Sequence, residues 1–168
     1  GHHADIAQWG LDRDTSGPVS IEGYAPFEPD GIYDSPKSYR YTCRYADGIE
    51  LVVADGSQVK SGTTWYGEKG EWVYVNRGHF DASTPKIRDS KVEAGELRLR
   101  SPGHQRNFID CVKNRDTSLT PAEVAHRSAS IGHLGQIAML TGRKIAWDPA
   151  KEQILNDPAA AALLGRAP

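Results

Sequence analysis

The sequence predicts an α+β fold, in which an open, largely antiparallel β-sheet carries helices packed on one face. A helix pattern at the start is followed by a run of strand patterns and then by further helix patterns. That order is typical of helices collected on one side of an antiparallel sheet. Residues 39–54 alternate around Asp47-Gly48 as a hairpin does, and residues 120–142 form a long helix pattern with one apolar stripe.

Composition predicts a single soluble domain over residues 1–168. The chain is 38% hydrophobic and 25% charged, with a formal net charge of −2. This near-neutral balance gives no electrostatic reason to expect nucleic acid as a partner. No run approaches the roughly 18 apolar residues that a spanning helix needs, and no signal peptide is visible. We therefore expect no membrane partner and a cytoplasmic location, with an exported parent protein left open.

The first elements follow in order from the start of the chain. Residues 2–11 have the periodicity of a short amphipathic helix, which Gly10 and a polar run end. Residues 19–24 alternate as a first strand, with Val19 and Ile21 on one face. Residues 25–37 contain three prolines and are expected to form a loop.

Residues 39–45 and 49–54 are the clearest hairpin in the sequence. Asp47-Gly48 predicts a two-residue type I′ turn between them. Counting outward from that turn pairs Tyr45 with Glu50, Cys43 with Val52 and Tyr41 with Ala54. On this count Arg40 and Arg44 share the other face with Leu51 and Val53, so both faces should mix polar and apolar residues.

A second hairpin is expected from residues 63–67 and 72–76, with a short edge strand at 79–81. Residues 83–95 are polar and predict a surface excursion. Leu97 and Leu99 alternate with arginines, which predicts one more short strand. Residues 101–114 then predict a helix with an apolar stripe of Phe108, Ile109 and Val112.

The long helix has a strong start signal. Thr120 can cap it, Pro121 fits the first helical position, and Glu123 can close a capping box. Its interior glycines, Gly132 and Gly135, cost about 1 kcal/mol each against alanine, so we expect close packing against a sheet. Gly142 predicts its end. Residues 144–147 should be extended, and Asp157-Pro158 should begin a final helix.

Cys43 lies in a strand pattern and Cys111 in a helix pattern, which favours two buried thiols over a disulfide. The sequence lacks the glycine-rich dinucleotide fingerprint, the phosphate loop and the serine nucleophile elbow. The polar cluster that could carry chemistry is His2-His3-Ala4-Asp5, where His2 and Asp5 share a helix face.

A histidine at a solvent-facing helix start can pass a proton at neutral pH. Two other interpretations of residues 1–5 stay open. Gly1-His2-His3 is also what a purification tag leaves behind. A metal site of His2, Asp5 and His3 is disfavoured, because adjacent helix residues rarely converge on one ion.

Five segments together resemble the C-terminal half of NAD(P)-dependent oxidoreductases of the Gfo/Idh/MocA family. They are residues 1–10 (GHHADIAQWG), 66–75 (YGEKGEWVYV), 107–112 (NFIDCV), 126–135 (HRSASIGHLG) and 147–149 (WDP). Their order and spacing cover nearly the whole chain. The resemblance implies a two-part enzyme, with an N-terminal dinucleotide-binding domain that is missing here. It also implies an open sheet that pairs with another subunit.

In the family pattern an Asp follows the catalytic His by three residues. Asp5 matches that Asp, which makes His2 the counterpart of the catalytic histidine, with His3 and Asp5 as substrate-binding residues. The earlier Asp of the pattern, the Lys-Pro motif and the cofactor domain are not in these 168 residues. No residue here is expected to bind cofactor or metal.

The resemblance implies reversible hydride transfer between NAD or NADP and a sugar or polyol in the full-length parent. We expect the chain by itself to be inactive, to bind no cofactor alone, and to form a homo-oligomer through its open sheet face. The alternative is a non-catalytic carbohydrate- or protein-binding module, in which Tyr39, Tyr41, Trp65 and Trp72 would form a stacking surface. A metal-dependent hydrolase is a weaker third hypothesis.

Overall fold

The computed structural model describes residues 1–28, 30, 32, 35–96 and 100–165. Its helices are α1 (His2–Gly10), α2 (Pro85–Arg88), α3 (His104–Asn114), α4 (Ala122–Thr141) and α5 (Pro158–Ala161), the last continued by the 3-10 turn η1 (Ala162–Leu164). Its strands are β1 (Ser20–Tyr24), β2 (Arg40–Arg44), β3 (Glu50–Ala54), β4 (Thr63–Tyr66), β5 (Trp72–Asn76), β6 (His79–Ala82), β7 (Ile145–Asp148) and β8 (Gln153–Leu155).

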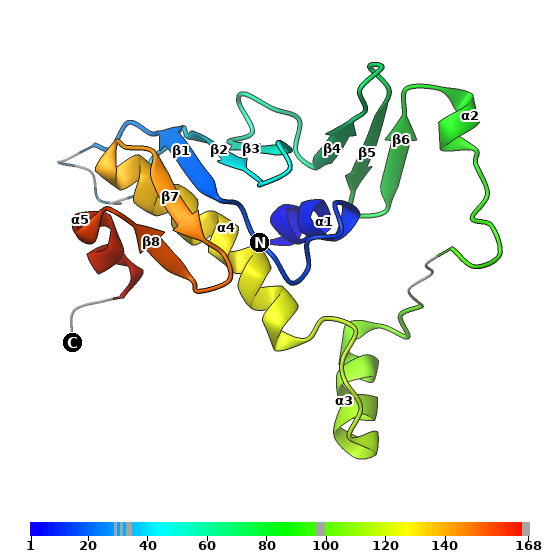
Figure 1. The fold of residues 1–168 in the computed structure, drawn as a ribbon. Coiled ribbons are helices and arrows are strands. Elements are labelled where there is room, and N and C mark those ends of the chain that lie inside the picture. The colour runs from blue at the N-terminus through cyan, green and yellow to red at the C-terminus, as the bar shows by residue number, and fades with distance from the viewer. Residues whose placement is uncertain (29, 31, 33–34, 97–99, 166–168) are drawn as a thin grey trace.

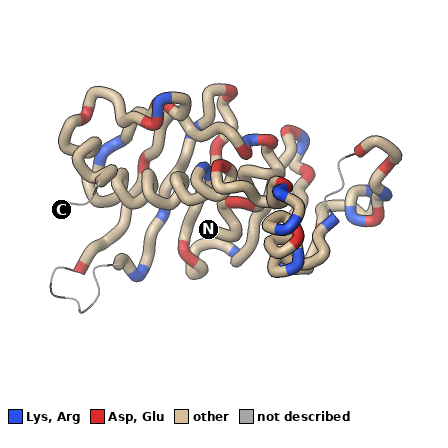
Figure 2. The backbone as a smooth tube through the Cα atoms, turned by 90° about the horizontal axis from the view of Figure 1, so that it is seen from below, with Lys and Arg blue, Asp and Glu red and all other residues tan. Residues whose placement is uncertain are grey.

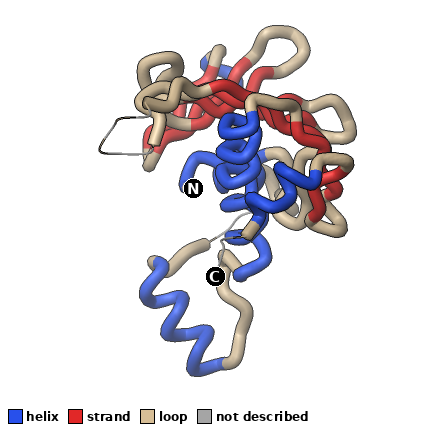
Figure 3. The backbone as a smooth tube through the Cα atoms, turned by 90° about the vertical axis from the view of Figure 1, so that its left-hand side faces the viewer, coloured by secondary structure: helices blue, strands red, loops and turns tan. Residues whose placement is uncertain are grey.

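The strands form two antiparallel sheets with helices beneath them (Figures 1 and 3). One sheet has five strands in the order β3-β2-β1-β7-β8, and the other has three in the order β4-β5-β6. Helix α4 packs against β1 and β2, while α1 packs against both α4 and β4. The predicted α+β class, with an antiparallel sheet and helices on one side, is confirmed.

The predicted register of the first hairpin is wrong by one residue. Cys43 pairs with Leu51 and Arg44 with Glu50. The loop has three residues, because the Tyr45 N–H donates to the carbonyl of Ile49 at 2.9 Å and Gly48 takes a φ of 89°. A three-residue loop that ends on a left-handed glycine is the next commonest hairpin connection after the two-residue turn.

This shift separates the two faces that the sequence analysis expected to be mixed. A one-residue change of pairing moves every partner side chain to the opposite face. Tyr41, Cys43 and Tyr45 are buried on the helix side, with Leu51 and Val53 packed against the same core. The other face carries Arg40, Thr42, Arg44, Glu50 and Val52.

Helix α4 packs against one face of the five-stranded sheet. Ile131 and Leu134 are fully buried beneath it, and the core also includes Ile21, Cys43, Ile145 and Trp147. Gly135 lies directly under Tyr41, where a Cβ would come within 2.5 Å of the ring. The predicted close approach is therefore real at Gly135, whereas a Cβ at Gly132 would meet open space.

The predicted capping box of α4 is not formed. Pro121 occupies the N-cap position, no side chain caps the helix, and Glu123 instead accepts from Arg127 Nε at 2.7 Å. The predicted end is correct, since Gly142 adopts the left-handed conformation at the C-cap. Asp157 caps α5 as expected, by accepting from Ala160 N–H at 3.0 Å.

Helix α3 stands apart from the rest of the molecule (Figure 3). It starts at His104, three residues after the predicted start, and none of its residues is buried. Phe108 remains 67% exposed and Val112 52% exposed, so the predicted apolar stripe contributes little to the described core. Cys111 is only partly buried, which corrects the expectation for that thiol, whereas Cys43 is buried and both are free.

Two elements were not predicted. Helix α2 lies within the excursion at 83–95, where Thr84 caps it, and β8 adds an edge to the five-stranded sheet. Both are very short, and short elements carry little periodic signal. The strand predicted at Leu97 and Leu99 lies outside the described residues.

Candidate functional site

The start of α1 is the centre of the candidate site. The Gly1 carbonyl accepts from the Asp5 N–H at 2.9 Å, which closes the first helical turn around His2, His3 and Ala4. The side chain of His2 is exposed and forms no hydrogen bond to any described residue. Neither ring nitrogen of His2 is therefore occupied by a partner among the described residues.

His3 is tied to the three-stranded sheet. Its Nε2 lies 3.3 Å from Oδ1 of Asn76, at the end of β5. Its main-chain carbonyl accepts from Thr63 Oγ1, at the start of β4, at 3.0 Å. Both the ring and the backbone of His3 are thus fixed by residues more than fifty positions away in the sequence.

Asp5 is tied to α4. Its Oδ1 accepts from the hydroxyl of Ser128 at 2.8 Å, and Ser128 is itself buried. The pKa of the Asp14 carboxyl group is raised by burial first, and then by the negative charges of Asp5 and Asp12. Asp5 therefore bridges α1 and α4 in a locally acidic environment.

The three predicted site residues share one helix but contact different surroundings. His2 faces solvent, His3 contacts β5, and Asp5 contacts α4. They do not converge on one point. Within the described ranges, no group of three His, Cys, Asp or Glu side chains is arranged to hold a metal ion.

Sequence reasoning missed three residues that fix the start of this helix, Thr63, Asn76 and Ser128. Ser128 belongs to residues 126–128, which join α4 to separate parts of the fold. His126 Nε2 lies 2.6 Å from Glu152 Oε1, and Arg127 Nη1 donates to the Pro149 carbonyl at 2.6 Å. The spacing of these residues gave no sign of such long-range contacts, since each partner comes from a distant segment.

The aromatic residues considered as a stacking surface are largely structural. Tyr41 is buried in the core, and Tyr39 stacks on it with ring centroids 6.3 Å apart. The indole nitrogen of Trp65 is buried and has no hydrogen-bond partner among the described residues. These rings do not form one exposed platform.

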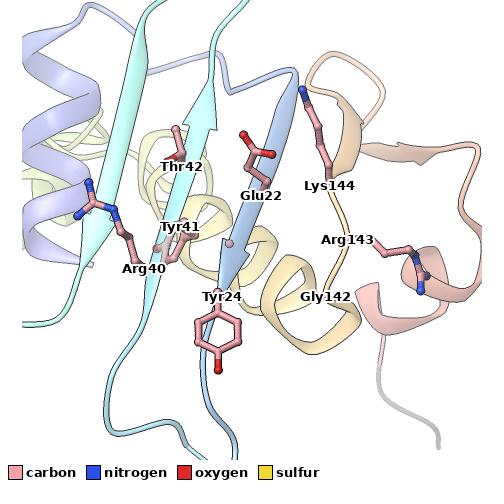
Figure 4. A pocket seen from close by; sticks show the side chains of 9 residues that line it. Glu22, Tyr24, Arg40, Tyr41, Thr42, Gly142, Arg143 and Lys144 are labelled. Carbon is pink, nitrogen blue, oxygen red and sulfur yellow. The ribbon is translucent and has the colours of Figure 1, made fainter.

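A shallow notch of about 420 Å³ opens in the five-stranded sheet (Figure 4). Within the described residues, β7 pairs with β1 only at Ser20 and Ile21. The notch lies beside the rest of β1 and is also lined by Gly142, Arg143 and Lys144. The side chains of Arg40, Tyr24 and Lys144 point in different directions in the close-up view. The polar groups of the notch therefore do not converge on a single ligand position.

The open face of the five-stranded sheet carries a charge ladder across three strands. Arg44 forms ion pairs with both Glu22 and Glu50. Elsewhere in the described chain, acidic and basic residues are interspersed (Figure 2). In the part of the chain that the structure describes, no helix is both long and apolar enough to cross a bilayer.

A dinucleotide cofactor does not fit this arrangement. Such a cofactor usually sits at a helix N-terminus that follows a parallel strand in a βαβ unit. Every strand pair among the described residues is antiparallel. The described residues therefore provide no such cradle for NAD or NADP.

The fold resembles that of one part of a known dehydrogenase. The crystal structure of the WlbA dehydrogenase from Bordetella pertussis, in complex with NADH and UDP-GlcNAcA, matches with a TM-score of 0.51 at 13% sequence identity. The match covers 88% of this chain and 43% of that chain, so this chain spans less than half of the dehydrogenase. At such low identity the likeness establishes the fold alone.

The family follows from the sequence itself. Residues 1–168 match the model of the Gfo/Idh/MocA oxidoreductase family, C-terminal alpha/beta domain. The chain belongs to this family, which confirms the resemblance found in its segments. A search of curated proteins finds no match.

Proposed function

We propose that residues 1–168 are the substrate-binding and oligomerisation domain of an oxidoreductase that transfers hydride between NAD or NADP and a sugar or polyol. The nucleotide is held by a separate dinucleotide-binding domain of the parent protein. Membership in the oxidoreductase family supports this proposal. Because the described residues offer no dinucleotide cradle, the chain alone should not turn over.

The observation that carries the proposal is the free imidazole of His2 on a helix whose start is fixed on two sides. An alcohol must lose its hydroxyl proton as hydride leaves the carbon, and a histidine is well suited to accept it. His2 takes this role, and the cofactor supplies the hydride acceptor. His3 and Asp5, which contact different parts of the fold, bind separate hydroxyl groups of the substrate.

A sugar substrate is supported by analogy. The WlbA dehydrogenase structure holds a sugar nucleotide, UDP-GlcNAcA, together with NADH. Sugars present several hydroxyl groups at once, and the polar side chains of His2, His3 and Asp5 offer hydrogen-bond partners along one helix turn. We extend this substrate class, but no particular sugar, to the parent protein.

A second copy of the chain packs on the open face of the five-stranded sheet in this proposal. Three apolar side chains flank the charge ladder there: Tyr24 is 73%, Leu155 41% and Val52 40% exposed.

Light scattering should give a mass above that of one chain. Val52→Arg should shift it toward the monomer, and Phe108→Arg on α3 should not. A monomer for the unmodified protein would rule this assembly out.

The experiment for the enzymatic role uses the full-length parent. NAD(H) and NADP(H) are titrated first, and a panel of sugars and polyols is then compared between the unmodified protein and His2→Ala. We expect unchanged nucleotide binding and a loss in kcat of about 100-fold or more, the usual contribution of a general base. His133→Ala, at an exposed position on α4, is the matched control. Equal kcat for His2→Ala and the unmodified enzyme would refute the role of His2.

A further inference from the structure

Asn76 orients the imidazole of His3. Its amide Nδ2 lies 3.0 Å from the carbonyl oxygen of Ser61, while its Oδ1 lies 3.3 Å from His3 Nε2. A main-chain carbonyl can only accept a hydrogen bond, so the atom of Asn76 that faces Ser61 has to be the NH₂ group. The network thus fixes which way the amide points, independently of the histidine.

The amide orientation in turn fixes the proton on His3. Oδ1 of Asn76 is a carbonyl oxygen and accepts only, so Nε2 of His3 has to donate. In the neutral imidazole, a proton on Nε2 leaves Nδ1 with a free lone pair. His3 then presents a hydrogen-bond acceptor, rather than a donor, on its second nitrogen.

Neighbouring residues also fix the positions of Ser61, Asn76 and His3. Asn76 precedes the Arg77-Gly78 turn, whose φ angles of 41° and 84° match a type I′ hairpin. The Ser61 carbonyl also accepts from the Tyr74 hydroxyl at 2.5 Å, and Lys60 Nζ lies 3.8 Å above the Tyr74 ring. Thr63 holds the main chain of His3 through its carbonyl oxygen, and Asn76 holds the imidazole ring.

We propose that Asn76 is a positioning residue that holds His3 as the Nε2–H tautomer, so that His3 Nδ1 accepts a hydrogen bond from a hydroxyl group of the substrate. This inference rests on the proposed function in one respect, the contact between His3 and substrate. The tautomer itself is a property of the 168-residue chain. His2, which no described residue holds, is free to move protons, whereas His3 recognises a hydroxyl group.

Side-chain ¹H–¹⁵N correlation spectra of the ¹⁵N-labelled chain test the tautomer, recorded at a pH where its histidines are neutral. We expect His3 to show a protonated Nε2 and an unprotonated Nδ1. In Asn76→Ala the two ring nitrogen signals should move toward each other, as the tautomers mix. Thr63→Val removes only the backbone contact and should leave the ring signals in place. A protonated Nδ1, or unchanged ring signals in Asn76→Ala, would overturn the proposal.

Asn76→Ser provides the same test should Asn76→Ala fail to fold, since a serine side chain is too short to reach both partners. The substrate contact is tested separately in the full-length parent. There Asn76→Ala should raise KM for the sugar about tenfold with unchanged nucleotide affinity, which corresponds to about 1.4 kcal/mol. An unchanged KM together with the expected tautomer would overturn the contact with substrate and leave the role of His2 intact.

Discussion

At the scale of single residues, the packing of α4 under the sheet depends on the absence of one side chain. Gly135 allows the Tyr41 ring to lie against the helix backbone, and that ring is almost wholly buried. Gly132, one turn earlier, has open space where its Cβ would be. Two glycines in one helix therefore have opposite consequences for stability.

Gly135→Ala should lower the free energy of unfolding. The added methyl group would overlap the Tyr41 ring, and overpacking of this kind costs about 1–3 kcal/mol. Gly132→Ala is the control, and should raise the free energy of unfolding by up to about 1 kcal/mol through helix propensity. Urea unfolding measures both. Equal effects of the two substitutions would contradict the packing described at Tyr41.

Asp55 shows how one carboxylate can make stability depend on pH. The Ser57 hydroxyl, the Tyr39 N–H and the Ser38 hydroxyl donate to it and hold its pKa well below the ordinary value. Its stabilising contribution is therefore present above the unfolded pKa of 3.8 and is lost as the pH falls below that value.

Asp55→Asn should lower the midpoint temperature of unfolding at neutral pH. It should also reduce the fall of that temperature between about pH 4 and about pH 2. Thermal unfolding followed across that range measures the effect. Asp116→Asn, at an exposed carboxylate beyond α3, should leave the profile unchanged. If the midpoint temperature falls as steeply in Asp55→Asn as in the unmodified protein, Asp55 does not cause the loss of stability at low pH.

The two cysteines also differ in burial. Desolvation raises the pKa of the Cys43 thiol to about 12, so it is protonated and enclosed at neutral pH. Cys111 on α3 is only partly buried. A thiol reagent should modify Cys111 in the native chain and reach Cys43 only after unfolding, as mass spectrometry of digested samples would show. Rapid native modification of Cys43 would contradict its burial.

At the scale of elements, what the sequence could predict depended on how local the signal was. The start and end of α1, the end of α4 at Gly142 and the cap at Asp157 follow from residues next to the element. The hairpin register failed because Asp47-Gly48 fits two loop lengths, and the choice depends on whether Ala46 joins the loop. The capping box failed because Pro121, which has no side-chain acceptor, takes the N-cap position in place of Thr120, and Glu123 pairs with Arg127.

In the candidate site, too, local features were predictable from the sequence and long-range contacts were not. Helix periodicity placed His2, His3 and Asp5 on one turn, which the structure confirms. The partners of two of them, Asn76 and Ser128, are 73 and 123 positions away, and no spacing rule connects such distant residues. Only the folded arrangement shows that His2 is the free member of the three.

Helix α3 and helix α4 should respond differently to loss of an apolar side chain. Ile131 is fully buried under the sheet, and Ile131→Ala should lower the free energy of unfolding by about 2–5 kcal/mol. Phe108 on α3 is largely exposed, so Phe108→Ala should stay within about 0.5 kcal/mol of the unmodified chain. Chemical unfolding of the two variants compares them. A large loss in Phe108→Ala would show that α3 packs against another surface.

At the scale of the whole molecule, the three-stranded sheet and helix α4 hold α1 from two sides. Its His3 is bound to the three-stranded sheet, and its Asp5 is bound to α4 beneath the five-stranded sheet. In the proposed parent enzyme, this arrangement presents the free imidazole of His2 to a nucleotide carried by another domain. We propose that this imidazole accepts the hydroxyl proton of the substrate.

Single-turnover hydride transfer in the full-length parent, with His2→Ala and added free imidazole, tests this role of His2. We expect a rate reduced by about 100-fold or more, which rises with imidazole concentration as the small base replaces the missing side chain. A reduced rate that imidazole does not restore would assign His2 a structural role. A rate equal to that of the unmodified enzyme would show that His2 does not accept this proton.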